Sequence, residues 1–137
     1  MSLVLDCSVA LAWLLPDERA KAAQAVLDRI AVSRAWVPEL WRLEVANSLQ
    51  VAVRHKRIDA AFRDASLADL SLLNIQIDPD TSSFAWSDTL QLADAHGLTL
   101  YDAAYLELAL RLGLPLASRD RQLRKAARSH KVLLLGA

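Results

Sequence analysis

The sequence predicts one α/β domain in which a central parallel sheet of four to five short strands lies between helices, giving three layers. Three observations lead to this prediction. The chain has 137 residues, enough for one domain and too few for two ordinary ones. It is 54% hydrophobic, and a chain of this length buries a core without disulfides or a structural metal. Short apolar runs alternate with amphipathic segments, as in parallel sheets covered on both faces. We therefore expect residues 1–137 to form a single domain.

The first elements follow from apolar runs and their breaks. Residues 3–5, Leu-Val-Leu, are a short apolar run that fits a buried strand. Residues 8–15 read as one or two helical turns that Pro16 stops. Residues 17–31 carry apolar side chains at helical spacing and predict an amphipathic helix. Residues 35–37 are the second strand candidate.

The middle of the chain is predicted to be mainly helical. Pro38 fits the first position of a helix that runs to about His55, because that position needs no backbone N–H. A further helix is expected over residues 59–73. Residues 75–77 form a third strand candidate, which the sequence Asp-Pro-Asp ends.

The last elements are bounded by two glycines that fit helix C-terminal caps, Gly97 and Gly113. Each follows a segment with helical periodicity, and short apolar runs come after the second. The expected elements are helices over residues 81–96, 100–112 and 120–127 and strands over residues 114–117 and 132–135.

Composition excludes several classes of protein. The single cysteine, Cys7, cannot form an internal disulfide, which suits a reducing cytosol. The longest early apolar run, residues 9–15, is far shorter than the roughly 20 residues of a membrane span, and no secretory signal is visible. Three glycines leave no room for a phosphate-binding loop or a dinucleotide fingerprint. We expect a cytoplasmic protein with no membrane partner.

The formal net charge is zero, with 16 basic and 16 acidic residues, but the basic residues are unevenly placed. Either a footprint for a phosphate backbone or a solvated helix face accounts for a cluster in the C-terminal quarter. The cluster consists of Arg111, Arg119, Arg121, Arg124, Lys125, Arg128 and Lys131.

Acidic residues follow two of the predicted strands. Asp6 comes directly after residues 3–5, and Asp120 lies just beyond residues 114–117. Ligands of parallel sheets bind beyond the carboxyl ends of the strands, so both acids are expected at one edge. Helix capping is the competing interpretation for Asp6, Asp120 and the serines beside them, and Thr99 with Asp102 resembles a capping box.

Glu44 does not fit a cap. It is expected about two turns inside a helix that is apolar nearly all round, on one stripe with Leu40 and Asn47. A buried carboxylate needs a cation or a hydrogen-bond donor, and Arg42 or Arg54 remains a possible partner.

Together, these carboxylates without evident basic partners favour a hard divalent cation, Mg²⁺ with Mn²⁺ as a substitute. Zinc is not expected, because Cys7 is alone and the three histidines lack ligand spacing.

Four segments, taken in order, resemble the motifs of PIN-domain ribonucleases, and most closely the VapC-type toxins of type II toxin–antitoxin pairs. "LVLDCSVALAWLLPDE" resembles the D-x-S motif and "ELWRLEVANSLQVAVRHKRI" the E-x-x-N helix. "LTLYDAAYLELALRLGLPLASRDRQL" resembles the Y-D-A-x-Y-L segment and the T/S-x-D-x-x-L close, with Ser118 where the family often has Thr. The resemblance covers nearly the whole chain and implies a PIN-like fold.

The resemblance also implies roles. Asp6, Glu44, Asp102 and Asp120 would be the catalytic and metal-binding residues, with Ser8, Asn47 and Ser118 as hydrogen-bonding groups behind them. The implied activity is metal-dependent endoribonuclease hydrolysis of RNA phosphodiesters. The implied partners are an RNA substrate, a cognate antitoxin and a second copy in a homodimer. Trp13, Leu14 and Leu15 are candidates for the antitoxin groove, with ordinary core packing as the alternative.

Two other functions remain open at this level. A metal-dependent phosphatase would use Asp6 as nucleophile, but it would want an acid where Ser8 stands. A catalytically inactive binding module with an acidic pocket is the non-enzymatic alternative. Asp94 and Glu107 match no motif acid and are not candidates.

Overall fold

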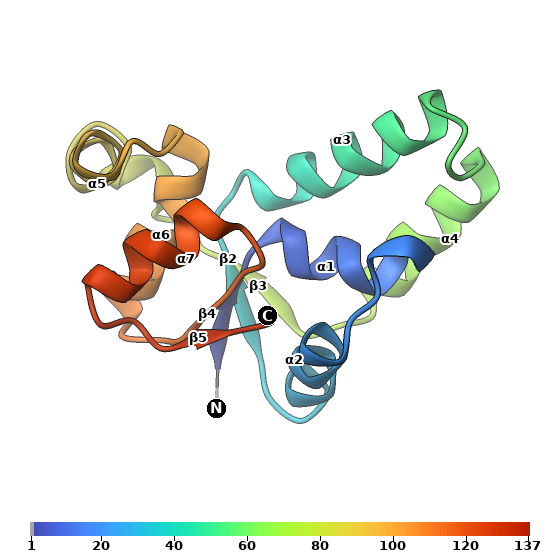
Figure 1. Cartoon of the computed structure of the whole chain (residues 1–137), viewed down its shortest axis with the longest axis horizontal. Coiled ribbons are helices and arrows are strands. Elements are labelled where there is room, and N and C mark those ends of the chain that lie inside the picture. Colours follow the sequence, from blue (N-terminus) through green and yellow to red (C-terminus); the bar gives the residue numbers. More distant parts are fainter. Residues whose placement is uncertain (1) are drawn as a thin grey trace.

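The computed structural model describes residues 2–137 and contains a five-stranded sheet that is parallel throughout. The strand order is β3-β2-β1-β4-β5, so the first strand in the sequence lies at the centre (Figure 1). The strands are β1 (Leu3–Leu5), β2 (Ala35–Val37), β3 (Ile75–Ile77), β4 (Leu116–Ala117) and β5 (Leu134–Leu135).

Helices cover both faces of this sheet. Figure 1 shows α1 to α4 on one side and α5 to α7 on the other, which is the expected three-layer arrangement. The helices are α1 (Cys7–Leu14), α2 (Lys21–Ala31), α3 (Trp41–Arg54), α4 (Ala60–Ser71), α5 (Asp88–His96), α6 (Leu100–Leu112) and α7 (Arg121–Ser129). None of the helices within residues 2–137 combines the length and apolar character that crossing a membrane requires.

The core lies around β1, whose three residues are fully buried. On one side of the sheet the buried residues of α1 and α3 pack together, and on the other Leu106 and Leu108 of α6 are also fully buried. A strand buried on both faces must be apolar at every position, which is why β1 reads as an unbroken apolar run.

Strand pairing brings two distant parts of the chain together. Leu5 of β1 pairs with Ala117 of β4, and the backbone N–H of Asp6 donates to the carbonyl of Ala117 at 2.9 Å. Because both strands are parallel, Asp6 and Ser118 leave the sheet at the same edge. The expectation that β1 and β4 deliver their polar residues to one edge is therefore confirmed.

Several predicted boundaries were wrong. Residues 17–31 are not one helix, because a 3-10 turn (Pro16–Glu18) precedes extended backbone at Ala20. The helix expected from Pro38 begins at Trp41, since Pro38 instead accepts a turn hydrogen bond from the Trp41 N–H.

The predicted helix over residues 81–96 is also divided. A 3-10 turn (Thr81–Phe84) is separated from α5 by Ser87, whose backbone is not helical. The strands β4 and β5 are each two residues long, shorter than the predicted runs. Both glycine caps are confirmed, with positive φ angles of 63° at Gly97 and 65° at Gly113.

Candidate active site

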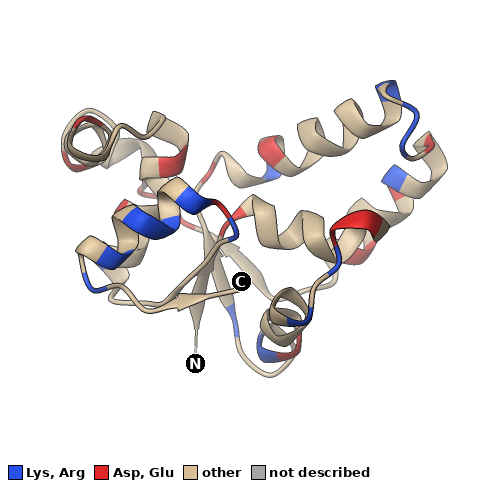
Figure 2. Ribbon diagram, in the orientation of Figure 1, with Lys and Arg blue, Asp and Glu red and all other residues tan. Residues whose placement is uncertain are grey.

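Four carboxylates gather at the carboxyl edge of the sheet, each carried by a different segment. Asp6 follows β1, Glu44 lies in the first turn of α3, Asp102 lies in the first turn of α6, and Asp120 immediately precedes α7. Their charges are close enough to repel: Asp102 and Asp120 act on Asp6, and Asp6 and Asp102 act on Glu44. In Figure 2, acidic segments meet near the ends of the central strands, between the two groups of helices.

Asp6 is the most deeply placed of the four, with 5% of its surface exposed. Its Oδ2 atom accepts two hydrogen bonds, one from Ser8 Oγ at 2.6 Å and one from Ser118 Oγ at 2.8 Å. No hydrogen bond reaches Oδ1 within residues 2–137. The two serines therefore hold the carboxylate by one oxygen and leave the other free for a ligand.

The two serine hydroxyls are themselves fixed by the backbone. Ser8 Oγ accepts from the N–H of Arg119 at 2.9 Å, and Ser118 Oγ accepts from the N–H of Asp120 at 3.1 Å. Each hydroxyl has one hydrogen, so accepting from the backbone directs that hydrogen to Asp6. The segment after β1 and the segment after β4 are thus joined through the Asp6 carboxylate.

Burial sets the ionisation of Asp6. Desolvation raises its pKa to about 6, and repulsion from Asp102 and Asp120 adds to this, although the serine hydrogen bonds lower it. The pKa of Asp102 is raised by burial and then by the charge of Asp120. These raised pKa values mean that burial and mutual repulsion make the ionised forms of Asp6 and Asp102 unfavourable in the protein without a bound cation.

Glu44 has a partner that the sequence analysis missed. Its Oε1 accepts from the hydroxyl of Tyr105 at 2.5 Å, and Tyr105 is fully buried on α6. Burial raises the pKa of Glu44, and the tyrosine hydrogen bond lowers it. The signal was present in the sequence, since Tyr105 lies three residues after Asp102 and therefore on the same helix face.

The description of Glu44 as two turns inside its helix was wrong. Because α3 begins at Trp41, Glu44 occupies the first turn, and its side chain contacts Tyr105 rather than capping the helix. The helix is also not apolar all round: Leu43 is 77% exposed, and Asn47 is exposed. Asn47 makes no side-chain hydrogen bond within the described residues, and its role stays a prediction.

Capping and acid clustering are both present, on different residues. Asp120 caps α7, its Oδ1 accepting from the Leu123 N–H at 2.8 Å, and Thr99 caps α6 by accepting from the Asp102 N–H at 3.1 Å. Asp6 stands at the cap position of α1 but forms no side-chain cap hydrogen bond. Capping therefore accounts for one oxygen of Asp120 and does not account for the carboxylates of Asp6 or Glu44.

Basic side chains do not neutralise the four acids. The ion pairs among residues 2–137 involve other carboxylates, and neither Arg42 nor Arg54 takes part in one. The donor set consists of carboxylate oxygens, which suit a hard divalent cation. Within the described chain no group of three or more acidic, histidine or cysteine side chains is arranged so that it could hold a metal ion. The oxygen donors at this edge therefore suit such a cation by their chemistry, although their positions do not surround one.

Glu107 belongs to a separate buried ion pair cluster. Arg111 donates to Glu107 at 2.8 Å and to Asp78 at 2.6 Å, and its guanidinium lies 4.4 Å from the centre of the Phe84 ring. Burial alone raises the pKa of Asp78, but the hydrogen bonds from Arg111 and its neighbours bring the pKa below its usual value. This cluster fastens the end of β3 to α6, so Arg111 is not free to bind phosphate.

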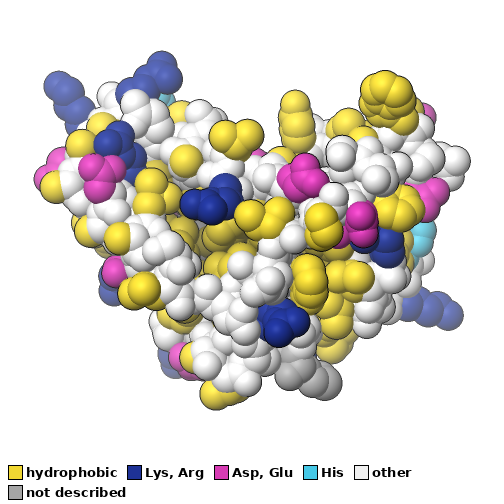
Figure 3. Space-filling model, turned by 180° about the vertical axis from the view of Figure 1, so that it is seen from behind, with side chains coloured by type: hydrophobic (Ala, Val, Ile, Leu, Met, Phe, Trp, Pro, Cys, Tyr) yellow, Lys and Arg dark blue, Asp and Glu magenta, His cyan; other side chains and the backbone are white. Residues whose placement is uncertain are grey.

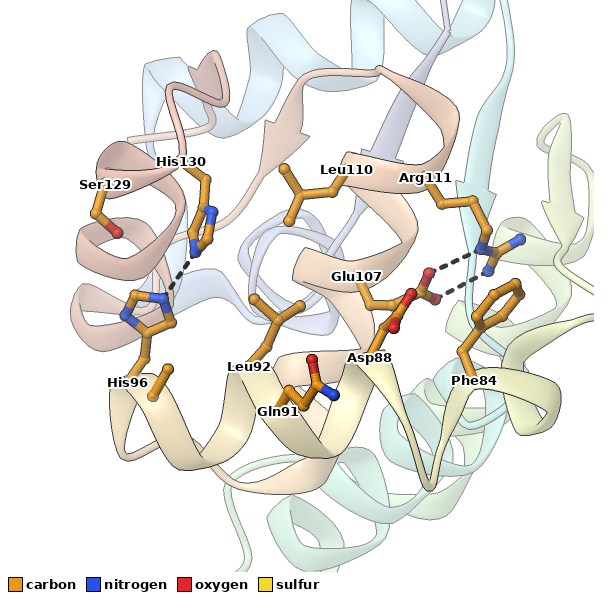
Figure 4. A pocket seen from close by; sticks show the side chains of 11 residues that line it. Phe84, Asp88, Gln91, Leu92, His96, Glu107, Leu110, Arg111, Ser129 and His130 are labelled. Atoms are coloured by element: carbon orange, nitrogen blue, oxygen red, sulfur yellow. Dashed lines mark hydrogen bonds and ion pairs between the residues drawn. The ribbon is translucent and has the colours of Figure 1, made fainter.

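A large cavity lies away from the acids. A cavity of about 820 Å³ lies between α5, α6 and α7, and none of the four carboxylates lines it. Figure 4 shows Leu92 and Leu110 facing its interior, with the Arg111–Glu107 pair at one end and His96 with His130 at the other.

Comparisons with known proteins agree with this geometry. The family model "PIN domain" matches residues 3–129. The chain is 31% identical over 123 residues to Ribonuclease VapC3 of Pyrobaculum aerophilum, covering 90% of this chain and 92% of that protein.

Solved structures share the fold. A protein from Pyrobaculum aerophilum matches with a TM-score of 0.70 and 24% identity over 98% of this chain and 89% of that one. The VapBC2 complex of Rickettsia felis bound to a promoter DNA fragment matches with a TM-score of 0.65 and 12% identity, covering 98% and 97%. A toxin–antitoxin complex from Klebsiella pneumoniae matches with a TM-score of 0.58 and 16% identity, covering 86% of each chain.

The parallel sheet, the order of the acidic segments and the family match over nearly the whole length lead to one assignment. This chain belongs to the PIN domain family.

Proposed function

We propose that the protein is a VapC-like toxin, a metal-dependent endoribonuclease that a cognate antitoxin neutralises. The observation that carries the proposal is the gathering of Asp6, Glu44, Asp102 and Asp120 at one sheet edge without basic partners. The similarity to Ribonuclease VapC3 supports the same activity. The proposal takes residues 1–137 as one PIN domain that acts in the cytoplasm.

The four carboxylates would hold Mg²⁺, with Mn²⁺ as a substitute. When bound, such a cation supplies Lewis-acid stabilisation of a phosphate and lowers the pKa of water. Asp6 offers Oδ1 because Ser8 and Ser118 occupy Oδ2. Asp120 offers Oδ2, since Oδ1 caps α7.

The residues of the site would then position the attacking water and accept its proton. Glu44, held by the Tyr105 hydroxyl, has a fixed orientation toward the other acids. The raised pKa values of Asp6, Glu44 and Asp102 come from burial and mutual repulsion, both of which a cation relieves. The cluster would therefore hold a divalent cation in exchange for protons, and its carboxylates would orient water for attack on the phosphodiester.

The exposed face of α7 supports a nucleic acid as substrate. Arg121, Lys125 and Arg128 are exposed, spaced by four and three residues, and make no side-chain hydrogen bond or ion pair within residues 2–137. Figure 2 shows basic segments along α7, which begins near acidic segments. The three residues form one stripe of the helix, placed to contact successive phosphates beside the cut.

Two other basic residues of the C-terminal cluster are used internally. Arg119 donates to the Glu18 carbonyl at 2.6 Å, and Arg124 donates to the carbonyls of Ser118 and Leu135. Burial, and then the charge of Arg128, lower the pKa of Arg124. The proposed phosphate contacts therefore involve the basic residues of this cluster without such internal contacts within residues 2–137, which are the outer stripe of α7 and the exposed Lys131.

Nuclease activity is tested by release of new RNA ends on adding Mn²⁺. Asp102→Asn should lower turnover at least ~100-fold if it supports charge in the transition state. Asp94→Asn is a matched control, because Asp94 is an exposed acid of α5 away from the cluster. Cleavage that survives EDTA, or full activity of folded Asp102→Asn, would rule out the assignment.

The antitoxin and a homodimer are the proposed protein partners. Exposed apolar side chains support such contacts, among them Leu43 and Trp86, which is 92% exposed. Figure 3 shows apolar side chains gathered in the hollow of the opposite face of the molecule. Leu15 is excluded from the antitoxin groove, because it is 3% exposed and belongs to the core, and the Trp13 indole N–H donates to the Ala23 carbonyl.

A further inference from the structure

A histidine pair lies outside the acid cluster, beside the cavity between α5, α6 and α7. His96 is the last residue of α5, and His130 directly follows α7. Their Nε2 atoms are 2.8 Å apart, and the rings meet edge to face with centroids 5.0 Å apart. Figure 4 shows the two rings directed at each other across the space between the helices. At this distance one Nε2 donates a hydrogen and the other accepts it.

We propose that His96 and His130 form a binding site for a transition-metal cation of the Zn²⁺ or Ni²⁺ class. Neutral imidazole is the commonest protein ligand for such ions. Zn–N bonds of about 2.0–2.1 Å in tetrahedral geometry place two ligand nitrogens about 3.3 Å apart. The two Nε2 atoms therefore have to separate by about half an ångström, and each ring has to turn its Nε2 lone pair from the other ring toward the cation.

Replacing the Nε2–Nε2 hydrogen bond by a cation needs only a change of tautomer in one histidine. The donating imidazole transfers its proton from Nε2 to Nδ1 through solvent, so both Nε2 lone pairs face the cation and both rings stay neutral. The pair lies at the surface, so water completes the coordination.

The charges around the pair act in opposite directions. The carboxyl-terminal ends of two nine-residue helices, α5 and α7, meet at these rings, and helix carboxyl ends carry partial negative charge. Arg128 and Lys131, on either side of His130, act in the opposite direction. Binding therefore depends on the metal–imidazole bonds themselves, which selects Zn²⁺, Ni²⁺ or Cu²⁺ over Mg²⁺.

Such a cation would lie at the opposite end of α7 from the acid cluster. The helix that ends at His130 begins at Asp120, one of the four clustered acids. A metal ion shared by His96 and His130 fixes the far end of α7 to α5. Its binding to the folded state alone stabilises that state and raises the melting temperature.

Calorimetric titration with Zn²⁺, in excess Mg²⁺ that occupies the acid cluster, tests the site. Wild type should bind one Zn²⁺, and His96→Gln and His130→Gln should each weaken binding at least about tenfold. His55→Gln is the matched control, because His55 is the third histidine of the chain and lies exposed at the end of α3. It should bind like wild type, and only wild type and this control should show the rise in melting temperature.

Two results would overturn the proposal. One is equal Zn²⁺ affinity in wild type and in the His96→Gln/His130→Gln double variant, with loss of affinity in Asp102→Asn instead, because the ion would then sit on the acids. The other is no Zn²⁺ binding by wild type, which would leave the pair as a hydrogen bond only. Melting curves without metal show that each variant is folded, so a loss of binding is attributable to the ligand removed.

Discussion

The carboxylate of Asp6 is buried, and its ionisation therefore makes the stability of the protein depend on pH. Its pKa is about 6 in the folded protein and 3.8 ordinarily. Between these values the folded state keeps a proton that the unfolded chain has released. Stability in the absence of metal should therefore fall as pH rises through this window, by roughly 3 kcal/mol at about 1.4 kcal/mol per pKa unit.

Urea unfolding of wild type and Asp6→Asn at pH 4 and pH 7, without divalent metal, measures this contribution. The stability of wild type relative to the variant should decrease toward pH 7, since asparagine does not titrate. Glu44 and Asp102, whose pKa values are also raised, change stability with the same sign and are present in both proteins. A difference between the two proteins that does not vary with pH would contradict the prediction.

Tyr105 is predicted to position Glu44 for metal binding. Tyr105→Phe removes the hydroxyl that donates to Glu44 and so removes an influence that lowers the pKa of that acid. A higher proportion of protonated Glu44 should raise the Mn²⁺ concentration needed for half-maximal cleavage and shift the activity profile to higher pH. The loss of stability should be about 1 kcal/mol, that of one hydrogen bond.

Tyr101→Phe is the control for this variant, because Tyr101 is 63% exposed on the same helix and makes no side-chain hydrogen bond within the described residues. A purely structural role for Tyr105 would lower stability without moving the Mn²⁺ dependence or the pH profile. Rapid cleavage with an unchanged Mn²⁺ requirement would therefore refute the positioning role.

The residues of the site were predictable to different degrees. Asp6 and Asp120 were placed correctly at one edge because each follows a strand, and parallel strands end together. Glu44 was singled out for a mistaken reason, since its helix begins later than expected. Tyr105 was missed because a tyrosine in an apolar stripe looks like core, and its hydroxyl contact crosses 61 positions of sequence.

Among the elements, α7 combines a structural and a proposed binding role. Its buried residues, Leu123, Ala126 and Ala127, face the core, and the basic stripe faces solvent. Replacing Arg121, Lys125 and Arg128 together by Ala should weaken RNA binding and flatten its salt dependence. The logarithmic slope should decrease by about 0.7 for each phosphate of a single strand that the variant no longer neutralises. Cleavage of a dinucleotide, too short to reach the stripe, should change little.

Lys21→Ala/Arg54→Ala, which removes two exposed basic residues elsewhere, controls for net charge. Binding of a non-cleavable RNA, measured over a range of salt concentrations, compares the variants. Equal slopes in all proteins would show that α7 does not contact phosphates. Failure of every protein to cleave even the dinucleotide would instead count against the nuclease assignment.

Helix and strand identities were predictable, whereas helix starts were not. Periodicity places α6 correctly to the residue, because glycine and threonine bound it on both sides. The starts of α2 and α3 were predicted early, since Asp17 and Pro38 have the composition of a helix start but form turns instead. Turn hydrogen bonds of this kind depend on where the preceding strand ends in the sheet, and the local sequence does not determine that point.

For the molecule as a whole, repulsion within the acid cluster lowers stability, and the proposed cation would remove that repulsion. Without metal, Asp102→Asn takes one repelling charge away and should melt at a higher temperature than wild type. Adding Mg²⁺ or Mn²⁺ should raise the melting temperature of wild type more than that of the variant, because the variant has lost a ligand. Four melting curves at fixed ionic strength check this, and a more stable metal-free wild type with no Mn²⁺ effect would reject the metal cluster.

At the same scale, the alternation of apolar and amphipathic segments predicted the sheet and its layers. It did not predict the long-range ion pairs that join the sheet to the helices. The Asp78–Arg111–Glu107 cluster joins β3 to α6 across 33 positions, and nothing in the spacing of these residues indicates it. Arg111 was counted with the basic footprint for that reason. Long-range ion pairs depend on which elements become neighbours, and that is fixed only when the chain has folded.

The hydrogen bonds from Ser8 and Ser118 to Asp6 join two segments that are far apart in the sequence, so the site is completed late during synthesis. Ser118 is made 112 positions after Asp6, and Asp120 follows it. Until these residues have been added, the growing chain has neither the second donor to Asp6 nor the fourth acid. If the proposed ribonuclease activity needs all four acids, the growing chain is inactive until residue 120 of 137 has been added.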